Sequence, residues 1–189
     1  MNPQKRYILA ITGASGALYA RRLLEMMLRT GADIHLVVSD PGRRLLAEEM
    51  GGHDLLEGLP AERIIAHNVK DTGAAIASGS FLCDGMVIVP CTSHTLASVA
   101  NGFGDNLVHR AAAVCLKERR KLVLLHREMP LSLIDIRNME QATLAGAIVA
   151  PANPGFYTEP KTIDDLVNFV CARVMDLLGE PGHGVKRWE

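Results

Sequence analysis

The chain has 189 residues, of which 48% are apolar and 22% charged, proportions typical of one folded domain rather than a disordered chain. Lys and Arg total 20 and Asp and Glu total 21, so the charge balance excludes a general basic footprint for nucleic acid. The four cysteines have neither Cys-x-x-Cys nor zinc-finger spacing, which argues against a metal site and favours free thiols in a reducing compartment.

The amino-terminal segment is polar and leads into only a short apolar run. Such a run is too short for a signal peptide or a membrane-spanning helix. We therefore expect a cytoplasmic protein with no membrane segment.

Short apolar runs alternate with amphipathic stretches along the chain. Apolar runs without alternation are typical of strands buried on both faces. The expected strands cover residues 7–11, 33–38, 63–67, 85–89, 121–125 and 147–149. The expected helices cover about 15–29, 41–50, 94–101, 105–119, 136–145 and 162–178. This order predicts a single domain over residues 1–189, with a parallel sheet covered by helices on both faces.

Small and hydroxyl-bearing residues follow the expected strands at their carboxyl ends, where open α/β sheets bind ligands. They are Thr12–Gly16, Ser39, Thr92–Thr95, Arg127–Glu128 and Tyr157. Hydroxyls and free backbone N–H groups at helix starts suit a phosphate. The turn after the first strand lacks the full Gly-x-Gly-x-x-Gly pattern, so a mononucleotide is favoured over a dinucleotide.

Each of these features also has a purely structural explanation. The first turn needs a glycine and a capping serine in any case, and Thr92 and Ser93 are suitable helix caps. The adjacent Arg127–Glu128 pair suits an exposed ion pair of little energetic value. Arg173 borders the apolar stripe of the last helix, where an arginine either meets an anion or extends its charge into water. His94 is equally suited to packing or capping.

Seven short motifs occur in a fixed order along nearly the whole chain. They are residues 12–17 (TGASGA), 77–80 (ASGS), 86–91 (MVIVPC), 116–120 (LKERR), 127–128 (RE), 154–157 (PGFY) and 187–188 (RW). As an ordered set they resemble the UbiX-like flavin prenyltransferases. The resemblance implies a three-layer flavodoxin-like or Rossmann-like fold, reduced FMN as acceptor, dimethylallyl phosphate as donor and no metal.

The resemblance further implies that the product is FMN prenylated at N5 and C6, which serves a UbiD-type decarboxylase. It also implies a large homo-oligomer, commonly a dodecamer, with active sites at subunit interfaces. The residues of the sequence leave open whether the donor is a monophosphate or a pyrophosphate.

Roles for individual residues follow from the same resemblance. The flavin-binding positions are Gly13, Ala14, Ser15, Ser39, Thr92, Ser93, His94, Thr95 and Arg127. The prenyl phosphate would be held by Lys117, Glu128, Tyr157 and Arg173. The catalytic positions would be Ser15, Glu49, Lys117 and Glu128. Relatives often carry a residue other than histidine at position 94. The acceptor of the C6 proton stays open among two carboxylates, Glu49 and Glu128, and the retained phosphate.

Two other functions are compatible with an FMN site. Flavin-dependent cysteine decarboxylases use FMN on the same scaffold, but they need a histidine in an early helix. Here the early histidines fall in an expected strand, at His35, and in a loop, at His53. A non-catalytic FMN carrier or accessory subunit would bind FMN but would not need a second, cationic anion site.

Overall fold

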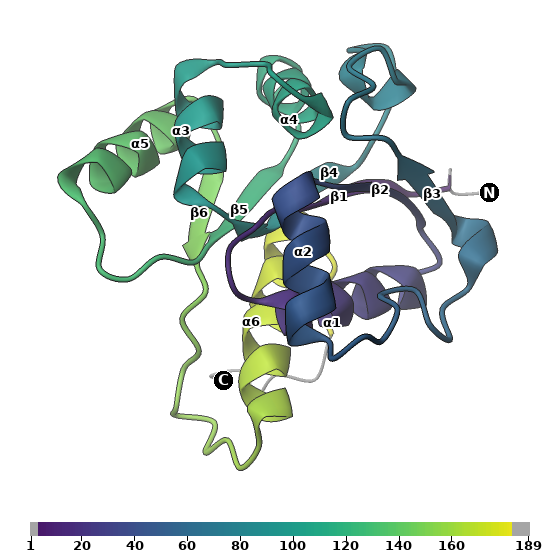
Figure 1. Ribbon diagram of the computed structural model, residues 1–189, viewed down its shortest axis with the longest axis vertical. Coiled ribbons are helices and arrows are strands. Elements are labelled where there is room, and N and C mark those ends of the chain that lie inside the picture. Colours follow the sequence, from purple (N-terminus) through teal and green to yellow (C-terminus); the bar gives the residue numbers. More distant parts are fainter. Residues whose placement is uncertain (1–3, 183–189) are drawn as a thin grey trace.

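The computed structural model describes residues 4–182, and its centre is a sheet of six strands (Figure 1). The strands are β1 (Arg6–Ile11), β2 (Asp33–Val38), β3 (Ile64–His67), β4 (Gly85–Cys91), β5 (Leu122–His126) and β6 (Ile148–Pro151). The α-helices are α1 (Ala17–Arg29), α2 (Asp40–Glu49), α3 (Ser93–Asn101), α4 (Leu107–Lys117), α5 (Leu133–Leu144) and α6 (Ile163–Leu178). Two short 3₁₀ helices are η1 (Ala61–Arg63) and η2 (Ala75–Ala77). The motif at 187–188 lies outside the described residues.

All strand pairs are parallel, and the strand order is β3-β2-β1-β4-β5-β6. This is the order of a Rossmann-type sheet, and it confirms the predicted parallel three-layer fold. The chain reverses its direction of winding between β1 and β4. A crevice forms beyond the carboxyl ends of strands at such a reversal, so the topology itself places a ligand site next to β1 and β4.

Alternate residues of each strand serve two separate cores. Leu9 and Ile11 of β1 pack with α1 and α6, whereas Ile8 and Ala10 pack with α3 and α4 on the other face. Figure 1 shows α1 and α6 on one side of the sheet and α3, α4 and α5 on the other. Burial on both faces explains why these strands read as continuous apolar runs in the sequence.

Helix starts account for the main shift from the expected boundaries. Helix α5 begins at Leu133, three residues before the expected start at 136. Ser132 and Asp135 form a reciprocal capping box there, which satisfies two backbone N–H groups and fixes the first turn. None of the helices described between residues 4 and 182 is both long and apolar enough to cross a membrane.

Candidate functional site

The candidate site begins where β1 and β4 end side by side. The Thr12 hydroxyl donates to the Pro90 carbonyl at 2.6 Å and accepts from the Thr92 backbone N–H at 3.0 Å. Thr12 is only 3% exposed, so its two hydrogen bonds are shielded from water. The hydroxyl therefore joins the loop after β1 to the loop after β4 and makes them one rigid edge.

A pocket of about 330 Å³ lies at this edge. It is lined by Thr12, Gly13, Ser39, Pro41, Thr92, His94, Thr95, Asn106, Val108 and His109. Three of these residues are the N-caps of α2, α3 and α4, and each accepts a hydrogen bond from the backbone of its own helix. Three helix N-termini at one pocket give it a positive potential without a Lys or Arg side chain in its wall. Such a site suits the phosphate of a mononucleotide.

Gly13 permits the close approach of the first turn to α2. A Cβ atom at Gly13 would lie 2.5 Å from Cβ of Pro41, closer than packed carbon atoms come. Gly13 and Pro41 both line the pocket. Glycine is therefore required here by contact with α2, and a side chain would move one wall of the pocket.

The Glu49 carboxylate holds the start of α1. Its Oε2 accepts the backbone N–H groups of Gly16 at 2.9 Å and Ala17 at 2.8 Å. Burial alone would raise the pKa of Glu49, but the Ser15 hydroxyl, these two amides and the nearby Arg127 guanidinium together hold that pKa below its usual value. Glu49 is therefore a carboxylate at neutral pH, and it fixes the turn that carries Ser15.

The ends of β4 and β5 bring the Arg127–Glu128 pair to the same edge. The Ser93 hydroxyl donates to Glu128 Oε2 at 3.4 Å, and the Met129 backbone N–H donates to Glu128 Oε1 at 3.1 Å. Arg127 is half-buried, and its Nε has no hydrogen-bond partner within the described part of the chain. The structure thus brings this pair to the loops after β1 and β4, as the sequence predicts.

Two of the predicted phosphate residues, Lys117 and Arg173, do not come together within one chain. Lys117 ends α4, where its Nζ lies 3.6 Å from Glu118 Oε1. Arg173 lies on α6, and its Nη1 lies 2.7 Å from Asp176 Oδ2. Helices α4 and α6 cover opposite faces of the sheet, so these two cations cannot hold one phosphate in the same subunit (Figure 1).

Tyr157 lies in the loop between β6 and α6, and its ring packs edge-on against Phe169 with centroids 5.6 Å apart. Gly155 precedes it, and a Cβ there would lie 2.9 Å from both rings. The Pro-Gly-Phe-Tyr motif therefore presents the tyrosine from a tightly packed loop on the α6 side of the sheet.

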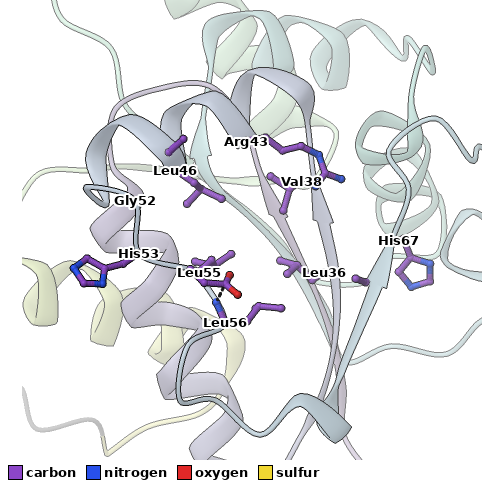
Figure 2. A pocket seen from close by; sticks show the side chains of 12 residues that line it. Leu36, Val38, Arg43, Leu46, Gly52, His53, Leu55, Leu56 and His67 are labelled. Atoms are coloured by element: carbon purple, nitrogen blue, oxygen red, sulfur yellow. Dashed lines mark hydrogen bonds between the residues drawn. The ribbon is translucent and has the colours of Figure 1, made fainter.

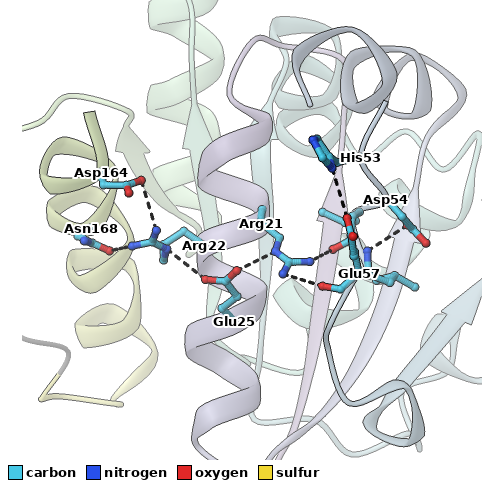
Figure 3. A network of polar contacts seen from close by, with 10 residues as sticks. Arg21, Arg22, Glu25, His53, Asp54, Glu57, Asp164 and Asn168 are labelled. Atoms are coloured by element: carbon cyan, nitrogen blue, oxygen red, sulfur yellow. Dashed lines mark hydrogen bonds and ion pairs between the residues drawn. The ribbon is translucent and has the colours of Figure 1, made fainter. Parts of the chain in front are cut away.

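A second pocket, of about 420 Å³, lies beside β2 and β3 and contains none of the predicted site residues (Figure 2). Its lining is Leu36, Val38, Arg43, Leu46, Ala47, Gly52, His53, Asp54, Leu55, Leu56, Ala66 and His67. Arg21 holds the loop at its wall: the guanidinium donates to the carbonyls of Leu55 at 2.5 Å and Glu57 at 2.8 Å, and also pairs with Glu25 (Figure 3). Most of the lining residues are apolar, and the charged or titratable ones are Arg43, His53, Asp54 and His67.

Sequence reasoning missed Asn106 and His109 in the wall of the first pocket. An Asn before a helical stretch is a recognisable N-cap signal, and the start of α4 lies at the same edge as the other caps. The described residues contain no group of three or more His, Cys, Asp or Glu side chains able to hold a metal ion.

Comparison with known proteins gives full-length matches. The model of the Flavoprotein family matches residues 1–175. Flavin prenyltransferase UbiX of Thermoplasma acidophilum is 47% identical over 186 residues, which cover 97% of this chain and 99% of that protein. The crystal structure of AnUbiX in complex with FMN and dimethylallyl pyrophosphate has a TM-score of 0.89 and 38% identity, over 98% of this chain and 100% of that chain. A dodecameric FMN-dependent UbiX-like decarboxylase from Escherichia coli O157:H7 has a TM-score of 0.89 and 39% identity, over 97% and 99% of the two chains.

Proposed function

The chain belongs to the UbiX-like flavin prenyltransferases of the Flavoprotein family, and on this premise we propose that it joins a dimethylallyl group to N5 and C6 of reduced FMN. The observation that carries the proposal is similarity over almost the full length, at 47% identity, to a relative named for this activity. The product would be passed to a UbiD-type decarboxylase in the cytoplasm.

We propose that the pocket at the β1–β4 edge binds FMN as the acceptor. Three N-capped helix starts and the hydroxyls of Thr12 and Ser39 suit the phosphate of FMN. The turn from Gly13 to Ser15 and the Arg127–Glu128 pair lie at the same edge and are proposed to hold the rest of the molecule. Bound there in reduced form, FMN would supply the nucleophilic nitrogen and carbon to which the prenyl group is joined.

The donor site is proposed to form between subunits. Lys117 and Arg173 lie on opposite faces of the sheet, so a phosphate that contacts both must lie between two copies of the chain. The loop after β5 and helix α5 expose an apolar surface next to Glu128. It is formed by Met129, Leu131, Leu133, Ile134, Ile136 and Leu144. Exposed large apolar side chains gathered on one loop and helix are typical of a subunit contact, in keeping with a dodecameric assembly.

The proposed roles at the donor site are electrostatic. Lys117, Arg173 and the Tyr157 hydroxyl would stabilise the negative charge that develops on the departing phosphate. The subunit contact would exclude water and orient the donor against the acceptor, which lowers the entropic part of the barrier.

The surroundings of Glu49 and Glu128 support different roles for the two carboxylates that the sequence leaves open as proton acceptors. Glu49 already accepts two backbone N–H groups, and its pKa is held below the usual value, so it is a weak base. Glu128 is exposed and accepts only a long 3.4 Å bond from Ser93 and one backbone N–H. We therefore assign the removal of the C6 proton to Glu128 and the positioning of Ser15 to Glu49.

The test is anaerobic turnover of purified protein with FMN, a reductant and dimethylallyl phosphate, followed by mass spectrometry of the flavin. A gain of one prenyl unit is expected, together with its loss in Lys117→Ala and Arg173→Ala. Unchanged FMN from protein that binds it would refute the transferase and favour a carrier. Oxidative decarboxylation of a cysteine-ended peptide would favour the cysteine decarboxylase.

A further inference from the structure

Three buried side-chain nitrogens lack a hydrogen-bond partner within residues 4–182: His109 Nδ1, His126 Nε2 and Arg127 Nε. His126 and Arg127 follow each other at the end of β5, and His109 lies in the first turn of α4. Unsatisfied buried groups are rare in folded proteins, and their concentration at one edge of the sheet indicates a site for a polar ligand. Of the three residues, only His109 lines the pocket.

The hydrogen bonds of Asn106 fix which nitrogen of His109 carries the proton. Asn106 Oδ1 accepts the His109 backbone N–H at 3.1 Å, so Asn106 Nδ2 is the atom that faces the imidazole, 3.5 Å from Nε2. An amide nitrogen can only donate, so Nε2 must accept and is unprotonated. In a neutral imidazole the proton then belongs to Nδ1, which is a hydrogen-bond donor without an acceptor.

The surroundings keep His109 neutral. The residue is 1% exposed, and its ring centroid lies 5.8 Å from that of His94. Burial and, next, the charge of His94 lower the pKa of His109, although Asp105 opposes this shift. A buried N–H donor without an acceptor is costly, and His109 lies in the wall of the pocket. A ligand in the pocket is the natural source of the acceptor.

We propose that His109 is a phosphate-recognition residue of the FMN site, and that its Nδ1–H donates to an oxygen of the FMN phosphate. This inference rests on the proposed binding of FMN, but not on prenyl transfer. None of the side chains lining the pocket is a Lys or Arg, so the phosphate is held by neutral donors and helix N-termini. Each neutral donor to a phosphate dianion then forms a charge-assisted bond, and the loss of one should be measurable.

The placement favours the phosphate over the sugar or the ring of the flavin. His109 lies in the first turn of α4, two positions after the helix begins at Leu107, so it shares the positive helix end capped by Asn106. The same pocket wall contains the caps of α2 and α3, Ser39 and Thr92. Three helix N-termini favour the part of FMN with the greatest negative charge, which is its phosphate.

The experiment compares FMN with riboflavin, which lacks only the phosphate, by titrating flavin fluorescence with flavin-free protein. His109→Leu keeps the approximate volume but removes the donor. His109→Asn keeps an amide N–H close to the position of Nδ1, whereas in His109→Gln the amide lies one bond further out. His53→Leu, in an exposed loop position, is the control for loss of a histidine elsewhere.

We expect His109→Leu to weaken FMN binding about tenfold or more, because a hydrogen bond to a charged group is worth roughly that factor. Riboflavin affinity should not change, and His109→Asn should restore most of the FMN affinity while His109→Gln restores less. Equal FMN affinity in wild type and His109→Leu, or equal weakening of both flavins, would overturn the proposal. If His109→Leu does not fold, equal FMN affinity in the Asn and Gln variants and wild type would do the same.

The proposed prenyl transfer and the proposed His109 contact can be refuted independently of each other. Wild-type protein that binds FMN through its phosphate but does not prenylate it would refute the transferase and leave the His109 contact standing. Wild-type protein that prenylates FMN but binds riboflavin as tightly as FMN would leave the transferase standing and refute the His109 contact.

Discussion

Replacement of Glu49 by alanine tests whether one carboxylate stabilises both the fold and the flavin turn. Glu49 Oε2 accepts the N–H groups of Gly16 and Ala17, and α1 has no side-chain cap of its own at Gly16. Removal of the carboxylate leaves two orphan donors at the start of α1, a loss comparable to the loss of an N-cap. Such losses cost about 0.5–2 kcal/mol, with hydrogen bonds to charged groups at the upper end.

We therefore expect Glu49→Ala to lower the free energy of unfolding by about 1–2 kcal/mol, allowing for the partial exposure of the carboxylate. For a chain of this size each kcal/mol lowers Tm by about 2–4 °C. The measurement is urea and thermal denaturation at one fixed protein concentration, because assembly also contributes to apparent stability. FMN affinity should fall in parallel, because the Ser15 turn loses its anchor.

The adjacent Glu48 is the matched control. It lies on the same helix, and its carboxylate makes only an exposed 3.6 Å ion pair with Arg44. Such pairs contribute little, so Glu48→Ala should change the free energy of unfolding by less than about 0.5 kcal/mol. Equal stability of the Glu48→Ala and Glu49→Ala variants would refute the capping role.

The pH dependence of Glu49 gives an independent check. The folded protein holds the pKa of Glu49 below its unfolded value, so its contribution is fully present above the unfolded pKa, near 4.5. The contribution is lost as the pH falls through the lower, folded pKa. Wild type and Glu49→Gln should therefore differ most in stability at neutral pH and converge in acid. A constant difference at every pH would contradict an ionised cap.

Three further perturbations follow from the fold. Burial, reinforced by the charges of His67 and Arg6, lowers the pKa of His35 to about 4, so the unfolded chain binds a proton at a higher pH than the folded chain. The free energy of unfolding in urea should therefore fall from pH 6.5 towards pH 4, and it should fall less steeply in His35→Gln. Gly13→Ala should weaken FMN binding measured by fluorescence, because its Cβ would meet Pro41 at 2.5 Å; unchanged affinity would contradict the close packing. Arg21→Ala should make the loop at residues 54–57 more sensitive to limited proteolysis, because it removes two hydrogen bonds to loop carbonyls.

Strands and layers could be predicted from the sequence because their signals are local. The run from Asp33 to Val38 is mainly apolar and bounded by turn residues, and it is β2 with the predicted bounds. The carboxyl-end rule predicts that Thr12, Ser39 and Thr92 lie at one edge of the sheet, and all three line the pocket there. Each of these predictions depends only on residues close together in the sequence or on the shared direction of parallel strands.

Features that depend on contacts between distant segments could not be predicted in this way. The capping of α1 by Glu49 joins residues more than 30 positions apart, and no local pattern indicates it. The donor at His109 depends on the tautomer imposed by Asn106, which requires the observed orientation of its amide. No local pattern indicates the sheet face on which Lys117 and Arg173 lie, because each is simply a cation on a helix.

Because Lys117 and Arg173 lie on opposite faces of the sheet, the proposed activity depends on association of subunits as well as on folding of each chain. Within residues 4–182, the six strands and both hydrophobic cores are formed by residues of one chain. Under the proposed function, the donor site exists only after association. Dilution would then stop turnover while every subunit remained folded, and specific activity would rise with subunit concentration until assembly was complete.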